Sequence, residues 1–234
     1  MTGHPATTLP YLTDQLTSTI SLTPSPVWLT TLLASLRPST PLPSLLATTR
    51  HRILASSLTD TLVASTRTTF PADIHAPPAG HEVPRERRIE GPLAVQVVGY
   101  EDIGRSRWEQ IEALEASERG EGRRGWAVVR VGEDGEGEAG RNAVGGMWKI
   151  EMMDAKGVRV WGLVVKDVPD LNGGMSIGLK MVLRNVVVAR GVVLLEPRCV
   201  TVLGGRIEAQ HKAWVEGRKT ELKALIDAER GQAG

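Results

Sequence analysis

Hydrophobic positions follow two different periods along this chain, and the change falls near residue 75. In the first part, apolar residues recur three and four positions apart, which is the period of an amphipathic helix. Ser25 followed by Pro26 suits a helix N-terminus, because serine caps helices and proline fits the first turn. The helical positions are Trp28, Leu29, Leu32, Leu33 and Leu36, then Leu45, Leu46, Ile53, Leu54, Leu58, Leu62 and Val63, with an earlier short helix from Leu9 to Ile20. We therefore expect residues 1–74 to form a small N-terminal helical bundle.

Residues 75–91 interrupt this pattern. They contain several prolines, which disfavour regular structure around them. They also carry a short basic cluster, Arg85, Arg87 and Arg88. We expect a linker here, and its basic cluster is either solvated charge or a contact to phosphates.

After the linker, the pattern becomes that of β-strands. Five runs rich in β-branched residues are separated by turns such as Asp154 to Gly157 and Arg190-Gly191. The runs cover residues 93–98, 148–153, 158–166, 179–189 and 192–203. Five such strands fit a five-stranded Greek-key barrel of the OB type over residues 92–205. Residues 206–234 then predict a C-terminal amphipathic helix, so the expected fold class is α+β: a helical bundle plus an all-β barrel.

The last run ends on Leu203-Gly204-Gly205. Its apolar residues suit a strand that helps to close the barrel. Because glycine tolerates a positive φ, the pair lets the chain turn sharply into the final helix.

The connection between the first two strands, residues 100–146, is much longer than the usual loop of a compact domain. It starts with a helix-like piece that carries Trp108, Ile111 and Leu114, and continues with a strand-like run that includes Trp126 and Val128. Large apolar groups on such an insertion either fold back onto their own barrel or anchor in a partner protein. The sequence leaves both interpretations open.

The composition argues against several classes of protein. The 234 residues carry a net charge of +1, so no overall field draws the chain to DNA or to an acidic membrane. The single cysteine, Cys199, excludes an intrachain disulfide and suggests a reducing compartment. The N-terminus lacks the pattern of a secretory signal, and no run reaches the ~18 apolar residues of a membrane span.

No group of residues has the pattern of a catalytic, cofactor or metal site. The five histidines are scattered, and neither they nor Cys199 have metal-ligand spacing. The glycine-rich residues 132–146 are acidic and lack the Gly-Lys-Ser/Thr ending of a phosphate loop. Acidic residues such as Glu101 and Asp102 have the spacing of a solvated helix face, with no nucleophile nearby in sequence. We therefore expect a protein that is not an enzyme and uses no cofactor or metal.

Two tryptophans support a nucleic-acid alternative. Trp148 and Trp161 lie on the second and third strands, where OB barrels stack the bases of single strands. Basic residues do not cluster around this pair, so packing within the barrel is the favoured interpretation. The alternative is an independent module for single-stranded or structured DNA, with Arg85, Arg87 and Arg88 as the better candidates for phosphate contacts.

Several motifs resemble the RecQ-mediated genome instability protein 1 family, in particular its short, fungal-type members. Residues 190–197, RGVVLLEP, followed by Val200 and by residues 202–205, VLGG, resemble its most recognisable signature. Residues 91–98, GPLAVQVV, with residues 101–103, EDI, and 108–111, WEQI, resemble the start of its OB domain. Residues 54–62, LASSLTDTL, resemble an element of its helical domain. The family's Leu-Thr-Asp-Gly turn corresponds to residues 152–157, MMDAKG.

The resemblance implies a non-catalytic subunit that acts in the nucleus with a type IA topoisomerase (topoisomerase III) and a RecQ helicase. Such complexes dissolve double Holliday junctions and decatenate DNA during repair, recombination and replication. In the family, the OB domain docks on the topoisomerase and the insertion reaches toward its DNA gate. The expected partner contacts are therefore Glu101, Asp102, Ile103, Trp108, Ile111, Leu114, Trp126 and Val128, and direct DNA binding is expected to be weak.

Overall fold

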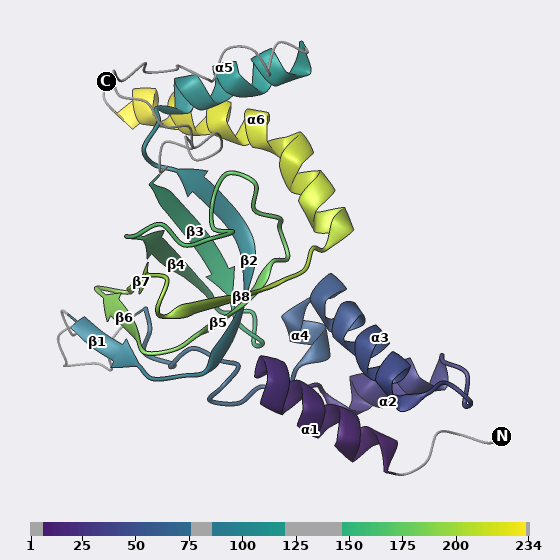
Figure 1. The fold of residues 1–234 in the computed structure, drawn as a ribbon. Helices are drawn as coiled ribbons and strands as arrows, with labels where there is room; N and C mark the ends of the chain where they lie inside the picture. The colour runs from purple at the N-terminus through teal and green to yellow at the C-terminus, as the bar shows by residue number, and fades with distance from the viewer. Residues whose placement is uncertain (1–6, 76–85, 120–146, 233–234) are drawn as a thin grey trace, which may run out of the picture.

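A computed structural model describes residues 7–75, 86–119 and 147–232. The helices α1 to α4 lie at one end of a curled β-sheet, and α5 and α6 lie at the other end (Figure 1). This arrangement confirms the predicted α+β class, with an N-terminal helical region, a barrel-like sheet and a C-terminal helix.

The N-terminal helices form where the apolar period predicts them. Their bounds are α1 Thr8–Ile20, α2 Pro26–Ala34, α3 Leu42–Ala55 and α4 Leu58–Thr61. Pro26 occupies the first position of α2, as expected, and Ser21 ends α1 in the left-handed conformation with a φ of 58°. The buried leucines and isoleucines form two clusters, and one of them also includes Ala94 of β2 and Ala155 of the turn between β3 and β4. The helices therefore share a core with the barrel.

The sheet contains eight strands within the described residues, where the sequence predicted five. They are β1 Glu86–Ile89, β2 Leu93–Asp102, β3 Trp148–Met153, β4 Arg159–Val164, β5 Lys180–Leu183, β6 Val186–Ala189, β7 Val192–Leu195 and β8 Val200–Gly204. The fourth and fifth predicted strands are each broken in two, at Arg184-Asn185 and at residues 196–199. Asn185 has a φ of 52°, which interrupts the extended backbone there.

The strand order is β1-β6-β7-β4-β3-β2-β5-β8. β6 pairs with β7, and β5 pairs with β8, so these four short strands are the two halves of one long hairpin. β7 pairs in parallel with β4, whereas β8 lies on the other side of the sheet, next to β5. Only residues 196–199 separate β7 from β8 in the chain. The sheet therefore curls back on itself, as the five-stranded barrel prediction requires.

The prediction that residues 75–91 lack regular structure is wrong for the second part of this segment. Residues 86–89 form β1, which pairs with β6 in antiparallel register. Ile89 packs against the barrel core, and Arg87 forms an ion pair with Asp73 at 2.7 Å. These tertiary contacts outweigh the local effect of the preceding prolines.

A buried carboxylate joins the barrel to the segment that follows the helices. Asp154, in the turn between β3 and β4, is fully buried. Its two carboxylate oxygens accept hydrogen bonds from the backbone N–H groups of Phe70 at 2.8 Å, Lys156 at 2.8 Å and Val158 at 2.9 Å. Because three donors satisfy the charge, the group is tolerated in the interior.

Two further buried polar side chains, Gln96 and Lys180, face each other across β2 and β5 and reach toward the helices. Gln96 Oε1 accepts a hydrogen bond from the Leu58 N–H at 3.1 Å, and Lys180 Nζ donates to the Leu54 carbonyl at 2.9 Å. Burial lowers the pKa of Lys180 to about 7. The barrel is thus bonded to the C-terminal end of α3 and to the first turn of α4.

The two glycines after the last strand now have separate explanations. Gly204 and Gly205 both have a positive φ, 85° and 99°, which confirms the expected turn. A Cβ on Gly205 would lie 2.5 Å from the Leu54 carbonyl oxygen, whereas a Cβ on Gly204 would meet nothing within 4 Å. Gly205 therefore also permits the close approach of α3 to the barrel.

Candidate partner-binding site

The start of the insertion is a fixed part of the structure. β2 extends to Asp102, four residues beyond the predicted strand end. Asp102 is buried, so the expectation that it lies on a solvated helix face is wrong. Its carboxylate accepts a hydrogen bond from the Gly104 N–H at 3.0 Å and lies 3.4 Å from Arg105 Nε, while its carbonyl accepts one from Gln110 Nε2 at 2.8 Å. These bonds hold the turn between β2 and the next helix.

Helix α5, Arg107–Glu118, begins with a reciprocal capping box. Ser106 Oγ accepts a hydrogen bond from the Glu109 N–H at 3.2 Å, and the Ser106 N–H donates to Glu109 Oε2 at 2.9 Å. The Ser-x-x-Glu spacing was visible in the sequence and is a recognised helix-start signal. This cap satisfies two backbone donors and helps α5 to form outside the barrel.

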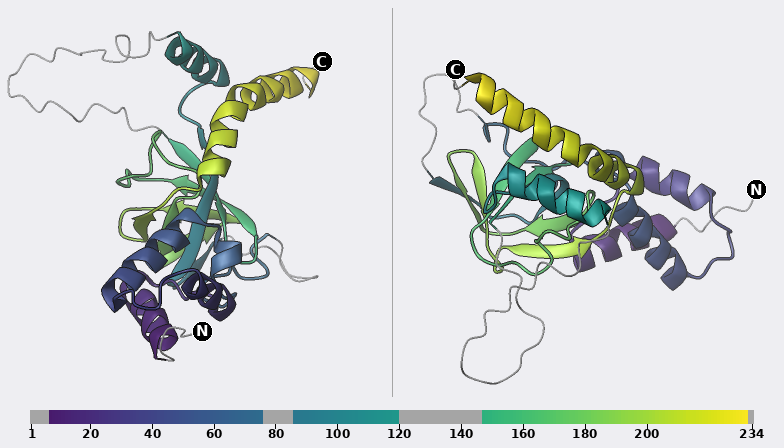
Figure 2. Two further views of the ribbon diagram at one scale, coloured as in Figure 1. Left: turned by 90° about the vertical axis from the view of Figure 1, so that its right-hand side faces the viewer. Right: turned by 90° about the horizontal axis from the view of Figure 1, so that it is seen from above.

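α5 packs along α6, Glu208–Gln232, in antiparallel orientation (Figure 2). Ile111 is only 1% exposed, and Leu222 on α6 is equally buried. Leu114 is half-buried on the same helix. For Ile111 and Leu114, the interpretation that the insertion folds back onto its own chain is therefore the better one.

Ion pairs line the contact between the two helices. Lys219 Nζ lies 3.2 Å from Glu115 and 2.9 Å from Glu118, and Lys223 lies 3.5 Å from Glu115. The hydrogen bonds to Glu118 and Glu115 raise the pKa of Lys219, and Lys219 lowers the pKa of Glu115. Because these groups are largely solvated, each pair contributes little to stability.

A groove of about 580 Å³ opens beside the first turn of α5. Two large apolar side chains on it remain in solvent: Ile103 is 42% exposed and Trp108 is 52% exposed. Ile226, Glu229 and Arg230 of α6 form its opposite wall, and the Arg230 guanidinium lies 5.9 Å from the centre of the Trp108 ring.

Charges around this groove are neutralised within the chain. Arg107 bonds to Glu229 and lies 3.5 Å from Glu101, and the bond to Glu229 raises the pKa of Arg107. Together with the Arg105–Asp102 pair, these contacts leave an apolar centre within a paired polar rim. A partner that covers the groove would meet little unpaired charge, which is the arrangement of an interface hot spot.

On the other side of α5, three aromatic rings line a pocket of about 370 Å³. The ring centre of Tyr100 lies 5.8 Å from that of Trp148 and 4.4 Å from that of Trp214 on α6. Burial raises the pKa of Tyr100. Arg218 borders the same pocket, 5.3 Å from the Trp214 ring centre. Trp148 therefore packs within its own chain, in agreement with the favoured interpretation.

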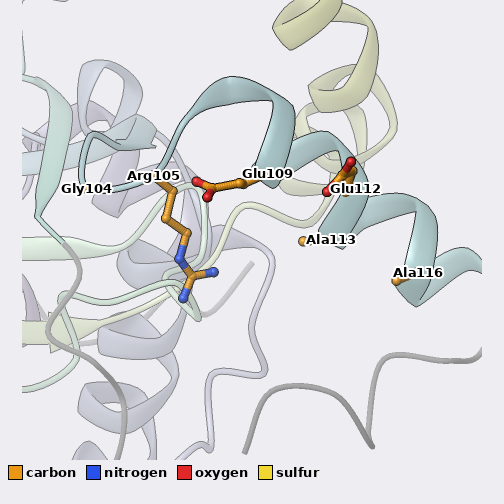
Figure 3. A pocket seen from close by; sticks show the side chains of 6 residues that line it. All are labelled: Gly104, Arg105, Glu109, Glu112, Ala113 and Ala116. Atoms are coloured by element: carbon orange, nitrogen blue, oxygen red, sulfur yellow. The ribbon is translucent and has the colours of Figure 1, made fainter. Parts of the chain in front are cut away.

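The outer side of α5 is polar. Figure 3 shows Arg105, Glu109 and Glu112 around an open recess of about 450 Å³, with Ala113 and Ala116 along the helix. Glu109 and Glu112 are exposed, which agrees with a solvated acidic face at these positions. The shallow, acidic recess has no feature of a catalytic pair.

The residues proposed for DNA contact are not brought together. Arg87 is paired with Asp73, whereas Arg88 points to the outer face of the sheet, opposite Val187. Trp161 is 37% exposed on that outer face, with Lys149 Nζ 4.1 Å from its ring centre. Trp126, Val128 and Arg85 lie outside the described residues.

The α6 side of the groove was not anticipated. Ile226 is an apolar position of the predicted C-terminal amphipathic helix, but Glu229 and Arg230 carry no sequence signal that links them to Trp108. Within residues 7–75, 86–119 and 147–232, no group of three histidine, cysteine, aspartate or glutamate side chains could hold a metal ion. No helix in the part of the chain that the structure describes is long and apolar enough to span a membrane.

Comparison with known proteins identifies both regions. Residues 70–218 match the family model described as "RMI1, N-terminal OB-fold domain", and residues 16–61 match "RMI1, N-terminal helical domain". One relative, RecQ-mediated genome instability protein 1 of Schizosaccharomyces pombe, is 31% identical over 150 residues. That match covers 57% of this chain and 64% of the relative, so the chain spans just under two thirds of the relative's length.

Proposed function

Because this chain belongs to the RMI1 family of OB-fold genome-stability scaffolds, we propose that it is a non-catalytic subunit that binds a type IA topoisomerase, topoisomerase III, through the α5–α6 end of its barrel. With this enzyme and a RecQ helicase it promotes decatenation and the dissolution of double Holliday junctions in the nucleus. The name of the fission yeast relative supports a role in the RecQ pathway.

The exposed pair Ile103 and Trp108 is the observation that carries this proposal. Both side chains stand on a platform held by the Asp102 bonds, the capping box and the contacts between α5 and α6. A pre-organised aromatic anchor loses little entropy on binding, so more of its burial energy appears as affinity. Residues 120–146, the rest of the insertion, follow α5 directly in the chain.

A subunit without catalytic activity could control a topoisomerase gate if its affinity for the open gate differs from its affinity for the closed gate. A protein that binds the open gate more tightly than the closed gate shifts that equilibrium toward opening, whereas equal affinity shifts nothing. A difference of about 1.4 kcal/mol changes the open-to-closed ratio tenfold. The side chains of the insertion would supply this difference.

The test measures affinity for purified topoisomerase III. Trp108→Ala should weaken binding by about tenfold or more, because truncation of an interface aromatic typically costs 1–2 kcal/mol or more. Trp161→Ala is the matched control, since it removes another exposed tryptophan from a distant face and should leave affinity unchanged. Equal affinities of wild type and Trp108→Ala would remove α5 from the interface.

A deletion separates docking from gate control. Removal of residues 120–145 leaves β2, α5 and α6 intact and should preserve topoisomerase binding while impairing decatenation by the complex. Normal decatenation by this deletion variant would contradict the role of the insertion.

A DNA-binding module is the second candidate, and the exposed Trp161 beside Lys149 is the observation in its favour. It predicts oligonucleotide affinity that falls steeply with salt and drops on Trp161→Ala or Trp148→Ala. Because Trp148 is half-buried, Trp161 is the one exposed ring of this pair, and a single ring does not form a platform for stacked bases. The scaffold is therefore the better-supported function.

A further inference from the structure

Strands β4, β6 and β7 are apolar on both faces. A barrel strand with one solvated face normally alternates apolar and polar residues, whereas continuous apolar runs are typical of strands covered on both sides. The inward positions of these strands are buried in the barrel core: Val160, Val164, Val186, Val188, Val193 and Leu195. Apart from Arg159 at the start of β4, the outward positions are also apolar, which the barrel core does not require.

These outward side chains form one continuous strip. Val187 of β6 lies opposite Leu194 of β7, and Leu194 is adjacent to Leu163 of β4. The complete strip is Trp161, Leu163, Val187, Ala189, Val192 and Leu194. None of the six belongs to the buried clusters of the described residues, and each is half-buried or exposed. Val165, 43% exposed, extends the strip beyond β4.

The rim of the strip is predominantly basic. Six basic and three acidic side chains lie around it. The basic residues are Arg88, Lys149, Arg159, Lys166, Arg190 and Arg198, and the acidic residues are Glu86, Glu151 and Glu196. Arg88 lies opposite Val187 at one edge, and Lys149 lies opposite Leu163 at the other. Two of the acids are already neutralised, since Glu151 pairs with Arg159 and Glu196 pairs with Arg198 and Lys166. The rim therefore has a net positive charge around an aliphatic centre.

We propose that this outer face, the β4–β7–β6 strip, binds an acidic amphipathic helix of a partner protein. The aliphatic stripe of the helix covers the strip, and its flanking carboxylates meet the basic rim. A second copy of the chain fits poorly, because it would bring two positive rims together. A nucleic acid fits poorly too, because the centre is aliphatic and Lys149 covers one face of the single ring, Trp161.

This face shares no residue with the groove beside Trp108, although Lys149 of its rim lies opposite Glu101 at the edge of that groove. β6 and β7 lie on the side of the barrel away from the helical region, and α5 and α6 cover one end (Figure 1). The inference therefore stands independently of the proposed topoisomerase contact.

The probe is a fluorescently labelled helical peptide of about 18 residues, roughly five turns, with leucines on one face and glutamates on the other. The full chain should bind it at low salt, and more weakly as salt rises. Leu163→Ser with Leu194→Ser should weaken binding by about tenfold or more. Arg88→Glu with Arg190→Glu should weaken it severalfold and reduce its salt dependence. The second pair changes exposed side chains only, so it tests the face even where the first pair affects folding.

Matched controls lie on α6. Leu225→Ser removes an exposed leucine from another face, and Lys212→Glu reverses an exposed charge, so both should bind like wild type. Equal binding of a peptide in which lysine replaces glutamate, or no binding of the acidic peptide, would overturn the proposal. Preferential displacement by an oligothymidine would assign the face to nucleic acid instead. A dimer that is lost in the leucine variants would assign it to self-association.

Discussion

The two ends of the barrel are joined to their helices by different kinds of contact. At the helical end, the buried groups Asp154, Gln96 and Lys180 bond directly to backbone atoms of the segment around α3, α4 and Phe70. At the other end, α5 lies on α6 through Ile111, Leu222 and solvated ion pairs. A buried bond is costly to break because it leaves an unsatisfied group, whereas a solvated ion pair is exchanged for water at little cost. Breaking the contacts at the first end is therefore expected to cost more stability than breaking the contact of α5 with α6.

Asp154→Ala should give the largest loss of stability. It leaves the buried N–H of Phe70 and the part-buried N–H groups of Lys156 and Val158 without an acceptor, and an unsatisfied buried donor costs about 1–3 kcal/mol. We expect the free energy of unfolding to fall by roughly 3 kcal/mol or more, measured by denaturant titration. Asp167→Ala is the control, because Asp167 is exposed. Equal stability of the two variants would contradict the expected cost of breaking the contacts at the helical end.

Alanine substitution of Gly204 and Gly205 distinguishes backbone strain from steric contact. Gly204→Ala adds only the strain of a positive φ, about 1–2 kcal/mol, since its Cβ meets nothing. Gly205→Ala adds the same strain and also pushes a Cβ against the Leu54 carbonyl, so we expect a loss of about 3 kcal/mol or more. Thermal unfolding of both variants should rank them in this order. A smaller loss for Gly205→Ala would show that α3 can move away from the barrel.

Lys180→Met should change how stability depends on pH. The pKa of Lys180 falls from the ordinary 10.5 to about 7 in the folded chain. Between these values the unfolded chain holds a proton that the folded chain has released, so stability rises with pH by up to about 1.4 kcal/mol per pH unit. The variant should lack this contribution between about pH 7 and 10, which denaturant titrations at several pH values would measure. If stability depends on pH with the same slope in wild type and variant, Lys180 stays protonated in the folded state. The carbonyl end of α3 would then favour its charged form.

Lys219→Ala should have the smallest effect. Loss of its pairs with Glu115 and Glu118 should reduce stability only slightly, and the difference should shrink at high salt. Hydrogen exchange of the α5 amides should increase all the same, because these pairs hold α5 on α6. A loss as large as that of Asp154→Ala would remove the contrast between the two ends.

Local patterns were sufficient for most of the fold. Period and capping residues predicted the helices near α1 to α3, the five-strand barrel and α6, because these signals act between residues close in sequence. They missed β1, whose pairing depends on contacts of Arg87 and Ile89 with distant residues. They also missed the breaks in the last two strands. At Asn185, the turn depends on a hydrogen bond from its N–H to the Glu90 carbonyl, far away in sequence.

The candidate site could be predicted only in part. The sequence selected Ile103, Trp108, Ile111 and Leu114 as one set, since all are apolar residues of the insertion. The structure divides them: Ile111 is buried under α6, whereas Ile103 and Trp108 remain in solvent. No local pattern could make this division, because it depends on where α6 lies.

The sequence by itself determined most of the elements, their order and the likeness to a family. Those properties follow from residue types and short spacings. Only the tertiary structure decided which end of the barrel is joined to its helices by buried bonds, which tryptophan is available to a partner and which strands leave an apolar outer face. These are properties of surfaces assembled from segments distant in sequence, and burial and pairing exist only once the chain has folded.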